Sequence, residues 1–353
     1  MDASIRLREI RYHEMLSQTV HLDASKQADI ALAAKLLREG QLVAFATETV
    51  YGLGANALSA QAVAGIFEAK QRPAWDPLIV HLGAAEELGG VAKVPGGLQE
   101  RVVALMRAFW PGPLTLLLPR SEVVPDAVTA GRELVGVRVP AHPAALALLA
   151  AAGVPVAAPS ANRFGHTSPT TAQHVLADLE GRIAAVLDAG PTTIGVESTV
   201  LDPTQTPMVL YRPGAVSAEE LTAVTGVAVR IFVPEATVEP EALPSPGVGI
   251  RHYAPRADMR LTEGSQAGLQ AALQEASARE VGVLLPDGWS IDGEAEIEPW
   301  GRWDDADSLA AGLFAGMRAL DDRGVAVILC PLPEPGGLAD AIRDRLMKAA
   351  REK

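Results

Sequence analysis

The sequence predicts an α/β protein in which a large, twisted mixed-sheet domain is followed by a smaller α/β domain. Helical and strand patterns alternate along roughly the first two thirds of the 353 residues. A proline-rich stretch then precedes a second, shorter alternation. Because one hydrophobic core rarely serves a chain of this length, we place the two domains at residues 1–233 and 257–353, joined by a linker over 234–256.

The first domain is predicted from apolar runs of strand length and from helices with recognisable ends. Ser25 is a candidate N-cap for a helix over 26–39, which Gly40 would end. Further helices are expected at 59–70, 98–109 and 143–152, and from Thr170 or Thr171 to about residue 179. Buried strands are expected at 42–46, 77–82, 114–118, 134–139, 154–158 and 184–188. Several connections are too short for a crossover helix, so part of the sheet should be antiparallel.

The linker and the second domain follow from a change in composition. The five prolines of residues 234–256 are Pro234, Pro240, Pro244, Pro246 and Pro255. This density disfavours regular structure and predicts a linker of limited flexibility. Beyond it, buried strands are expected at 281–285 and 325–329, with helices at 265–278, 308–321 and 338–353.

Charge and composition narrow the class of function. The formal net charge is −13, whereas proteins that bind nucleic acid through its phosphates usually present a basic surface. A dedicated RNA binder is therefore disfavoured, although a few cations could still gather in one pocket. The single cysteine, Cys330, excludes an internal disulfide framework and a cysteine-based zinc site. No apolar stretch is long enough to span a membrane, and the first residues lack the apolar core of a secretory signal. We therefore expect a cytoplasmic protein without membrane association.

Three polar segments near strand ends are candidates for a ligand site. Residues 47–54 place hydroxyls, a carboxylate and two glycines directly after a buried strand, which suits a small polar ligand or an ordinary turn. Lys70 and Arg72 lie at the end of a helix, where they could complement the helix dipole or hold phosphates; neither is expected in the core. Residues 158–162, with the sequence Ala-Pro-Ser-Ala-Asn, could also be a simple turn. All three lie at the edge where α/β sheets commonly bind ligands.

Other common catalytic signatures are missing from the sequence. There is no P-loop, no nucleophile elbow and no pair of histidines at zinc-binding spacing. Gly52-Leu53-Gly54 matches only part of a dinucleotide-binding fingerprint.

Together the motifs resemble those of a known family. Residues 47–57, 66–82, 137–142, 157–162, 195–200 and 212–214 resemble the YrdC-like domain of threonylcarbamoyl-AMP synthases. Ser245-Pro246-Gly247 and His252-Tyr253-Ala254-Pro255 resemble the linker of the long, two-domain form. The resemblance implies a YrdC-like catalytic domain, a linker that could close over the active site, and a small Rossmann-like C-terminal domain.

The resemblance also implies an activity and a set of site residues. The expected enzyme is a nucleotidyltransferase that makes L-threonylcarbamoyladenylate and pyrophosphate from L-threonine, bicarbonate and ATP, with Mg²⁺ accompanying the ATP and no metal held by protein side chains. The product would pass to a tRNA threonylcarbamoyltransferase complex for N6-threonylcarbamoyladenosine formation; direct binding of tRNA is left open. The catalytic residues carried over are Lys70, Arg72, Ser160 and Asn162. Those for L-threonine are Thr49, His81, Arg138, Ser160 and Ser198. Those for ATP are Lys70, Arg72, Asp76, Asn162, Thr170, Arg212 and Tyr253.

Three positions depart from the family pattern, and two other functions remain open. Ala46 stands where proline is usual, Asp76 where asparagine is common, and Gly249 where lysine is frequent. Asp76 would bring a negative charge close to the proposed nucleotide site. The alternatives are a carbamoyltransferase acting on another acceptor and a non-catalytic RNA-binding module.

Overall fold

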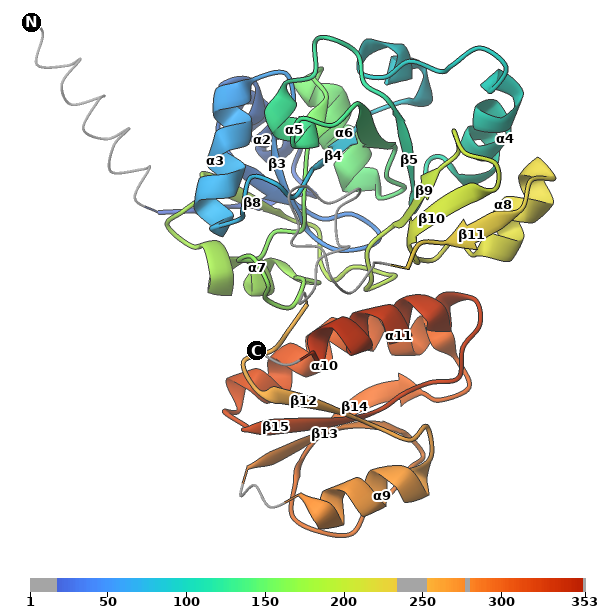
Figure 1. Cartoon of the computed structure of the whole chain (residues 1–353). Coiled ribbons are helices and arrows are strands. Elements are labelled where there is room, and N and C mark those ends of the chain that lie inside the picture. Colours follow the sequence, from blue (N-terminus) through green and yellow to red (C-terminus); the bar gives the residue numbers. More distant parts are fainter. Residues whose placement is uncertain (1–17, 234–252, 277–279, 352–353) are drawn as a thin grey trace, which may run out of the picture.

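The computed structural model describes residues 18–233, 253–276 and 280–351, which build two β-sheets (Figure 1). The first is an 11-stranded sheet in the order β1-β8-β2-β3-β7-β4-β6-β5-β9-β10-β11. The second has four strands in the order β12-β15-β13-β14. This confirms the predicted fold class.

The first sheet is mixed, as predicted. Its strands are β1 (Val20–Asp23), β2 (Val43–Phe45), β3 (Gly52–Asn56), β4 (Ile79–His81), β5 (Leu114–Pro119), β6 (Leu134–Arg138), β7 (Val156–Ala157), β8 (Ala185–Asp188), β9 (Thr199–Asp202), β10 (Met208–Arg212) and β11 (Val229–Ile231). β3 runs antiparallel to both β2 and β7, whereas β4 runs parallel to β6. The short β2–β3 connection therefore belongs to an antiparallel pair, and it carries the polar residues 47–51.

Some helices of this part begin at the polar or proline residues that predicted them, such as Ser59, Pro143 and Thr171. They are α2 (Gln27–Arg38), α3 (Ala60–Lys70), the 3-10 helix η1 (Ala85–Gly90), α4 (Gln99–Phe109), α5 (Asp126–Thr129), α6 (Pro143–Ala152), α7 (Ala172–Leu179) and α8 (Ala218–Thr225). The Thr171 hydroxyl accepts a hydrogen bond from the backbone N–H of His174 and so caps α7. The predicted cap of α2 is wrong. Lys26 occupies that N-cap position, and the Ser25 hydroxyl instead donates to Asp23 Oδ1 at 2.7 Å.

The second sheet is fully parallel and is covered on both faces. Its strands are β12 (Asp258–Thr262), β13 (Val281–Asp287), β14 (Glu296–Arg302) and β15 (Val327–Pro331). Helix α9 (Gln266–Glu275) covers one face, while α10 (Ala306–Asp322) and α11 (Leu338–Ala349) cover the face toward the first sheet (Figure 1). Most of the predicted linker lies outside the described residues, so its bounds stay a prediction.

The two parts share an apolar core. Val50 and Val196 belong to the first part, yet they fall in one buried cluster with Tyr253 and the apolar faces of α10 and α11. Burial of such surface is the main favourable term in association, so it stabilises the docking of α10 and α11 against the first part. In the described portion of the chain, no helix is long and apolar enough to cross a membrane.

Candidate active site

A small cavity gathers most of the predicted site residues. Its volume is about 50 Å³, well below the ~300 Å³ or more of typical ligand sites. The residues that line it are Thr47, Thr49, Val50, Gly52, Arg72, Pro77, Leu78, Ile79, His81, Arg138, Ala158, Pro159, Ser160, Glu197, Ser198, Arg212 and Tyr253. Three arginines and one glutamate give this cavity a positive balance within an acidic protein.

The turn after β2 places two hydroxyls against an arginine from β6. The Thr47 and Thr49 hydroxyls lie 2.8 Å apart, and Thr47 Oγ1 also donates to the carbonyl of Val50. Arg138 donates from Nη1 to Thr49 Oγ1 at 3.1 Å, and its Nη2 lies 2.6 Å from Glu48 Oε1. The predicted threonine residues Thr49 and Arg138 are thus in direct contact, and Glu48 offsets the arginine charge.

His81 lies in the same cavity as a neutral side chain. It ends β4 and is 4% exposed, with Nδ1 3.2 Å from the carbonyl of Ile79. Burial, together with the nearby charge of Arg138, lowers the pKa of His81 from 6.5 to about 3. At neutral pH it therefore adds no charge to the site and can only exchange hydrogen bonds with a ligand.

Arg72 and Asp76 form a buried pair beside the cavity. Arg72 Nη2 lies 2.9 Å from Asp76 Oδ2 and also donates to the carbonyl of Pro77. Burial raises the pKa of Asp76, and the neighbouring Arg72 opposes that shift. Asp76 is not among the cavity-lining residues. Its negative charge is directed at Arg72 in this structure.

Lys70 supports the site from behind. It ends α3, is 1% exposed, and donates from Nζ to the backbone carbonyls of Ser160 and Asn162. Lys70 does not line the cavity, so it positions the loop that carries two other predicted residues. The expectation that Lys70 and Arg72 lie outside the core is wrong, because carbonyl and carboxylate partners allow both cations to be buried.

The loop after β7 places Ser160, but not Asn162, among the residues that line the cavity. The Asn162 amide donates to the carbonyls of Arg163 at 2.9 Å and His166 at 2.7 Å. Asn162 is 1% exposed, and its Oδ1 has no hydrogen-bond partner within the described residues. A buried carbonyl oxygen in this state can accept a hydrogen bond from a ligand.

Ser198 immediately precedes β9, and Arg212 ends β10; the two strands are antiparallel neighbours. Arg212 donates from Nε to the Ser198 carbonyl at 3.0 Å and from Nη2 to the Ser198 hydroxyl at 3.1 Å. The same hydroxyl lies 2.8 Å from Thr115 Oγ1. These contacts fix the orientation of both predicted residues toward the cavity.

Tyr253 lines the cavity, whereas Thr170 does not. The Tyr253 ring is 1% exposed and stacks on Phe314 of α10, with ring centroids 5.7 Å apart. Its backbone has φ of 64°, a left-handed conformation that few residues other than glycine adopt. Thr170 does not line the cavity; its hydroxyl contacts His174 near the start of α7. An ATP molecule would have to displace Tyr253 or widen the cavity.

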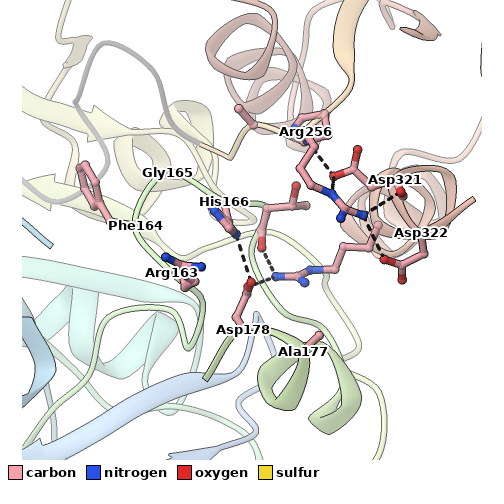
Figure 2. Close-up of a pocket in the computed structure, with 13 residues that line it drawn as sticks. Arg163, Phe164, Gly165, His166, Ala177, Asp178, Arg256, Asp321 and Asp322 are labelled. Atoms are coloured by element: carbon pink, nitrogen blue, oxygen red, sulfur yellow. Dashed lines mark hydrogen bonds and ion pairs between the residues drawn. The ribbon is translucent and has the colours of Figure 1, made fainter. Parts of the chain in front are cut away.

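A larger pocket of about 550 Å³ lies between the two parts of the chain (Figure 2). Its charged side chains largely pair with one another. His166 contacts Asp178, and Arg256 contacts Asp321 and Asp322. This pocket contains none of the predicted site residues.

Glu197 and Thr115 were not singled out from the sequence, and Glu48 was included only as the carboxylate of residues 47–54. Glu48 lies within the 47–57 motif, and Glu197 lies within the 195–200 motif beside Ser198. The family motifs therefore already contained both glutamates. In the described part of the chain, no three His, Cys, Asp or Glu side chains come together as a metal site. Glu48, Asp76 and Glu197 each lie against an arginine. Mg²⁺ held mainly by ATP phosphates and water is compatible with these residues and stays an expectation.

Comparisons with known proteins give the class. The family model Sua5_yciO_yrdC, described as "Telomere recombination", matches residues 35–214. The model described as "Threonylcarbamoyl-AMP synthase, C-terminal domain" matches residues 216–351. The fold and the site therefore define a two-domain enzyme of the Sua5 type.

The chain belongs to the threonylcarbamoyl-AMP synthase family, whose members are nucleotidyltransferase-type enzymes that form an adenylate. It is 44% identical to the synthase of Pyrococcus abyssi over 327 residues, which covers 91% of this chain and 94% of that one. It is also 44% identical to the Bacillus subtilis synthase over 332 residues, covering 93% and 94% of the two chains. The crystal structure of P. abyssi Sua5 complexed with L-threonine matches with a TM-score of 0.85 and 44% identity, covering 94% of this chain and 97% of that one.

Proposed function

We propose that this enzyme makes L-threonylcarbamoyladenylate from L-threonine, bicarbonate and ATP, with Mg²⁺ bound to the ATP. The observation that carries the proposal is the single cavity in which Thr49, His81, Arg138, Ser198 and Arg212 meet. A solved relative in complex with L-threonine supports the choice of amino acid. The product would serve N6-threonylcarbamoyladenosine formation in tRNA, through a separate threonylcarbamoyltransferase complex.

The reaction needs orientation and charge rather than a side-chain nucleophile. The threonine amine and bicarbonate form a carbamate with loss of water. A carbamate oxygen then attacks the α-phosphorus of ATP, and the bond to the β-phosphate breaks to release pyrophosphate. Fixed cations can stabilise the charge that develops in this step.

Individual residues can be assigned parts in this scheme. Arg138 would pair with the threonine carboxylate, since it already contacts Thr49 and a carboxylate. The Thr49, Ser160 and Ser198 hydroxyls would read the threonine side chain. Arg72 and Arg212 would face the phosphates, with Lys70 holding the loop of Ser160 and Asn162 in place. Asp76, Thr170 and Tyr253 would complete the surroundings of ATP.

The first experiment measures pyrophosphate release with ATP, Mg²⁺, bicarbonate and threonine, and identifies the adenylate by mass spectrometry. We expect release to require both threonine and bicarbonate. tRNA retention without ATP turnover would favour the RNA-binding alternative, and turnover with a different carbamoyl acceptor would favour the carbamoyltransferase.

Amino-acid selectivity tests the assigned hydroxyls. Valine replaces the threonine hydroxyl with a methyl group and would leave buried polar groups unpaired, so we expect kcat/KM to fall by about 10⁴-fold. Serine keeps the hydroxyl and loses one methyl, which typically costs about 10- to 200-fold. Equal turnover of valine and threonine would rule out this assignment.

A further inference from the structure

The C-terminal part inserts one arginine into the first part of the chain. Arg345 lies on α11 and is fully buried. Its Nε donates to Glu197 Oε2 at 2.8 Å, and its Nη2 lies 3.0 Å from the carbonyl of Pro213 and 3.4 Å from that of Glu197. One guanidinium thus bonds two separate segments of the other domain.

Those two segments carry predicted ligand-binding residues. Glu197 precedes Ser198, and Pro213 follows Arg212. Arg212 ties the same segments from the other side through its bonds to Ser198. The segments already touch: a side-chain carbon at Gly214 would lie 2.3 Å from the backbone nitrogen of Thr199. A shift of either segment would therefore move Ser198 and Arg212 together.

Arg345 also contacts Tyr253, which lines the cavity. Its guanidinium carbon lies 5.2 Å from the centroid of the Tyr253 ring, a distance typical of cation–π contacts. Phe314 of α10 stacks on the same ring. Tyr253 is thus held between two helices of the C-terminal part.

Holding the two parts of the chain together does not by itself explain the contacts of Arg345. Burying an arginine costs several kcal/mol before compensation, and the apolar cluster of α10 and α11 already supplies adhesion. Compensation is extensive: Arg345 Nη1 lies 2.6 Å from Asp344 Oδ2, and Lys348 Nζ lies 2.8 Å from Asp344 Oδ1. The planar guanidinium of Arg345 bonds several groups at fixed angles, so it can hold those groups in a defined orientation.

A second ion pair between the two parts provides a contrast. Arg318 of α10 lies 2.7 Å from Asp178 of α7, and these side chains are 11% and 8% exposed. Arg318 lines the larger pocket, and its guanidinium donates to the Thr167 carbonyl and to Asp178, neither of which lines the small cavity. The Arg318–Asp178 and Arg345–Glu197 pairs are both largely buried, but only the second includes a residue that lines the small cavity.

We propose that Arg345 is a positioning residue for the active site: it aligns the segments of Ser198 and Arg212 and the ring of Tyr253, so that the nucleotide site is complete only when the C-terminal part is docked. This inference rests on the proposed function. The C-terminal part then contributes to substrate binding through the residues that Arg345 positions.

The test compares Arg345→Lys with the control Arg318→Lys in the full chain. Both variants keep the charge and lose the planar fork. We expect Arg345→Lys to raise the KM for ATP and for threonine at least tenfold, and Arg318→Lys to change both less than twofold. A purely structural role would lower the active fraction, and hence kcat, without changing either KM. Unchanged KM values in Arg345→Lys would overturn the inference.

Two additions keep the test decisive. Asp344→Asn removes a carboxylate that orients Arg345 and does not line the cavity, and we expect it to raise the KM for ATP about threefold. If Arg345→Lys does not fold, this variant decides the matter. ATP affinity measured by calorimetry needs no turnover. If the wild type releases no pyrophosphate, the proposed function fails, while equal ATP affinity in wild type, Arg345→Lys and Asp344→Asn overturns the inference itself.

Discussion

The guanidinium of Arg72 and the carboxylate of Asp76 form an ion pair 2.9 Å long, with side chains only 3% and 1% exposed. Asparagine is common at position 76 in the family pattern. The Asp76 carboxylate forms an ion pair with Arg72, whereas a neutral asparagine amide would not. Breaking a buried pair from one side is usually costly, because it leaves the other charge uncompensated.

Asp76→Asn should therefore destabilise the ATP-free enzyme and favour ATP binding. We expect a loss of about 1–3 kcal/mol in the free energy of unfolding, and a dissociation constant for ATP lowered up to about tenfold, because the phosphates can then pair with Arg72. Urea unfolding with and without ATP measures both effects. The control is Asp126→Asn, which removes an exposed partner of Arg120 and should cost less than about 1 kcal/mol. An ATP affinity equal to that of the wild type would contradict the prediction.

Lys70→Met should impair catalysis through the loop that Lys70 holds. The variant loses two hydrogen bonds from a charged donor to the Ser160 and Asn162 carbonyls, so we expect turnover to fall at least tenfold, about 1.4 kcal/mol in activation free energy. Because Lys70 does not line the cavity, ATP affinity should fall less than kcat. The exposed Lys35 provides a matched Lys→Met control. A variant with normal kcat and weakened ATP binding would instead make Lys70 a direct phosphate ligand.

His81 predicts a specific pH dependence of stability. Its folded pKa of about 3 lies below the usual histidine pKa of 6.5, so between these values the unfolded chain binds more protons than the folded one. This residue's contribution is fully present above pH 6.5 and is lost as the pH falls toward 3, with a slope of up to about 1.4 kcal/mol per pH unit.

His81→Asn should remove that slope. Urea unfolding of both proteins at several pH values between 4 and 7.5 measures it, and the difference in stability between wild type and variant should shrink as the pH falls. His174→Asn is a useful comparison, because burial lowers the pKa of His174 to about 4. A difference between wild type and His81→Asn that stays constant with pH would show that His81 is not held neutral by the fold.

Tyr253 tests whether the linker acts as a lid over the nucleotide. Tyr253→Phe keeps the ring between Phe314 and Arg345 and loses the hydroxyl, so it should stay folded and weaken ATP binding about three- to tenfold. Tyr253→Ala removes the whole ring and should also speed hydrolysis of the adenylate, because water would reach it. Product yield per ATP consumed, followed with time, measures that loss. Full ATP affinity and full yield in both variants would reduce the linker to a tether.

Truncation after Val233 is a weaker test of the same idea. It would expose Val50 and Val196, which pack against the C-terminal part. Loss of activity in the truncated chain would therefore combine loss of the linker with loss of the shared core. Gly247 and Gly249 of the linker lie outside the described residues.

The sequence predicted many of the apolar elements and missed others, including the buried strands β9 and β10. The helix at 143–152 and the strand beginning at Leu114 are found where expected, since a continuous apolar run and a proline at the helix start leave few alternatives. β3 was missed because Gly-Leu-Gly-Ala-Asn has little strand propensity. β14 was missed because charged residues and a proline interrupt it.

The site shows the same limit. Thr49, Arg138 and Ser198, which the family motifs predicted to share a site, line one cavity. The burial of Lys70 and Arg72 was not predicted, because it depends on carbonyl and carboxylate partners that hydrophobicity patterns do not reveal. Arg345 and Glu197 are 148 residues apart, and no local pattern links them.

The strand order of the first sheet has a consequence for biosynthesis. β1 pairs with β8, and β8 also pairs with β2, so the chain must reach Asp188 before its earliest strand finds its neighbour. At about 5–20 residues per second, synthesis of residues 24–184 takes roughly 10–30 s. During that interval β2 can pair with β3 on one edge, but its other neighbour, β8, has not yet been synthesised. This makes the nascent chain dependent on helices α2 and α6, which pack on the same buried cluster as β2, to cover that surface until β8 emerges.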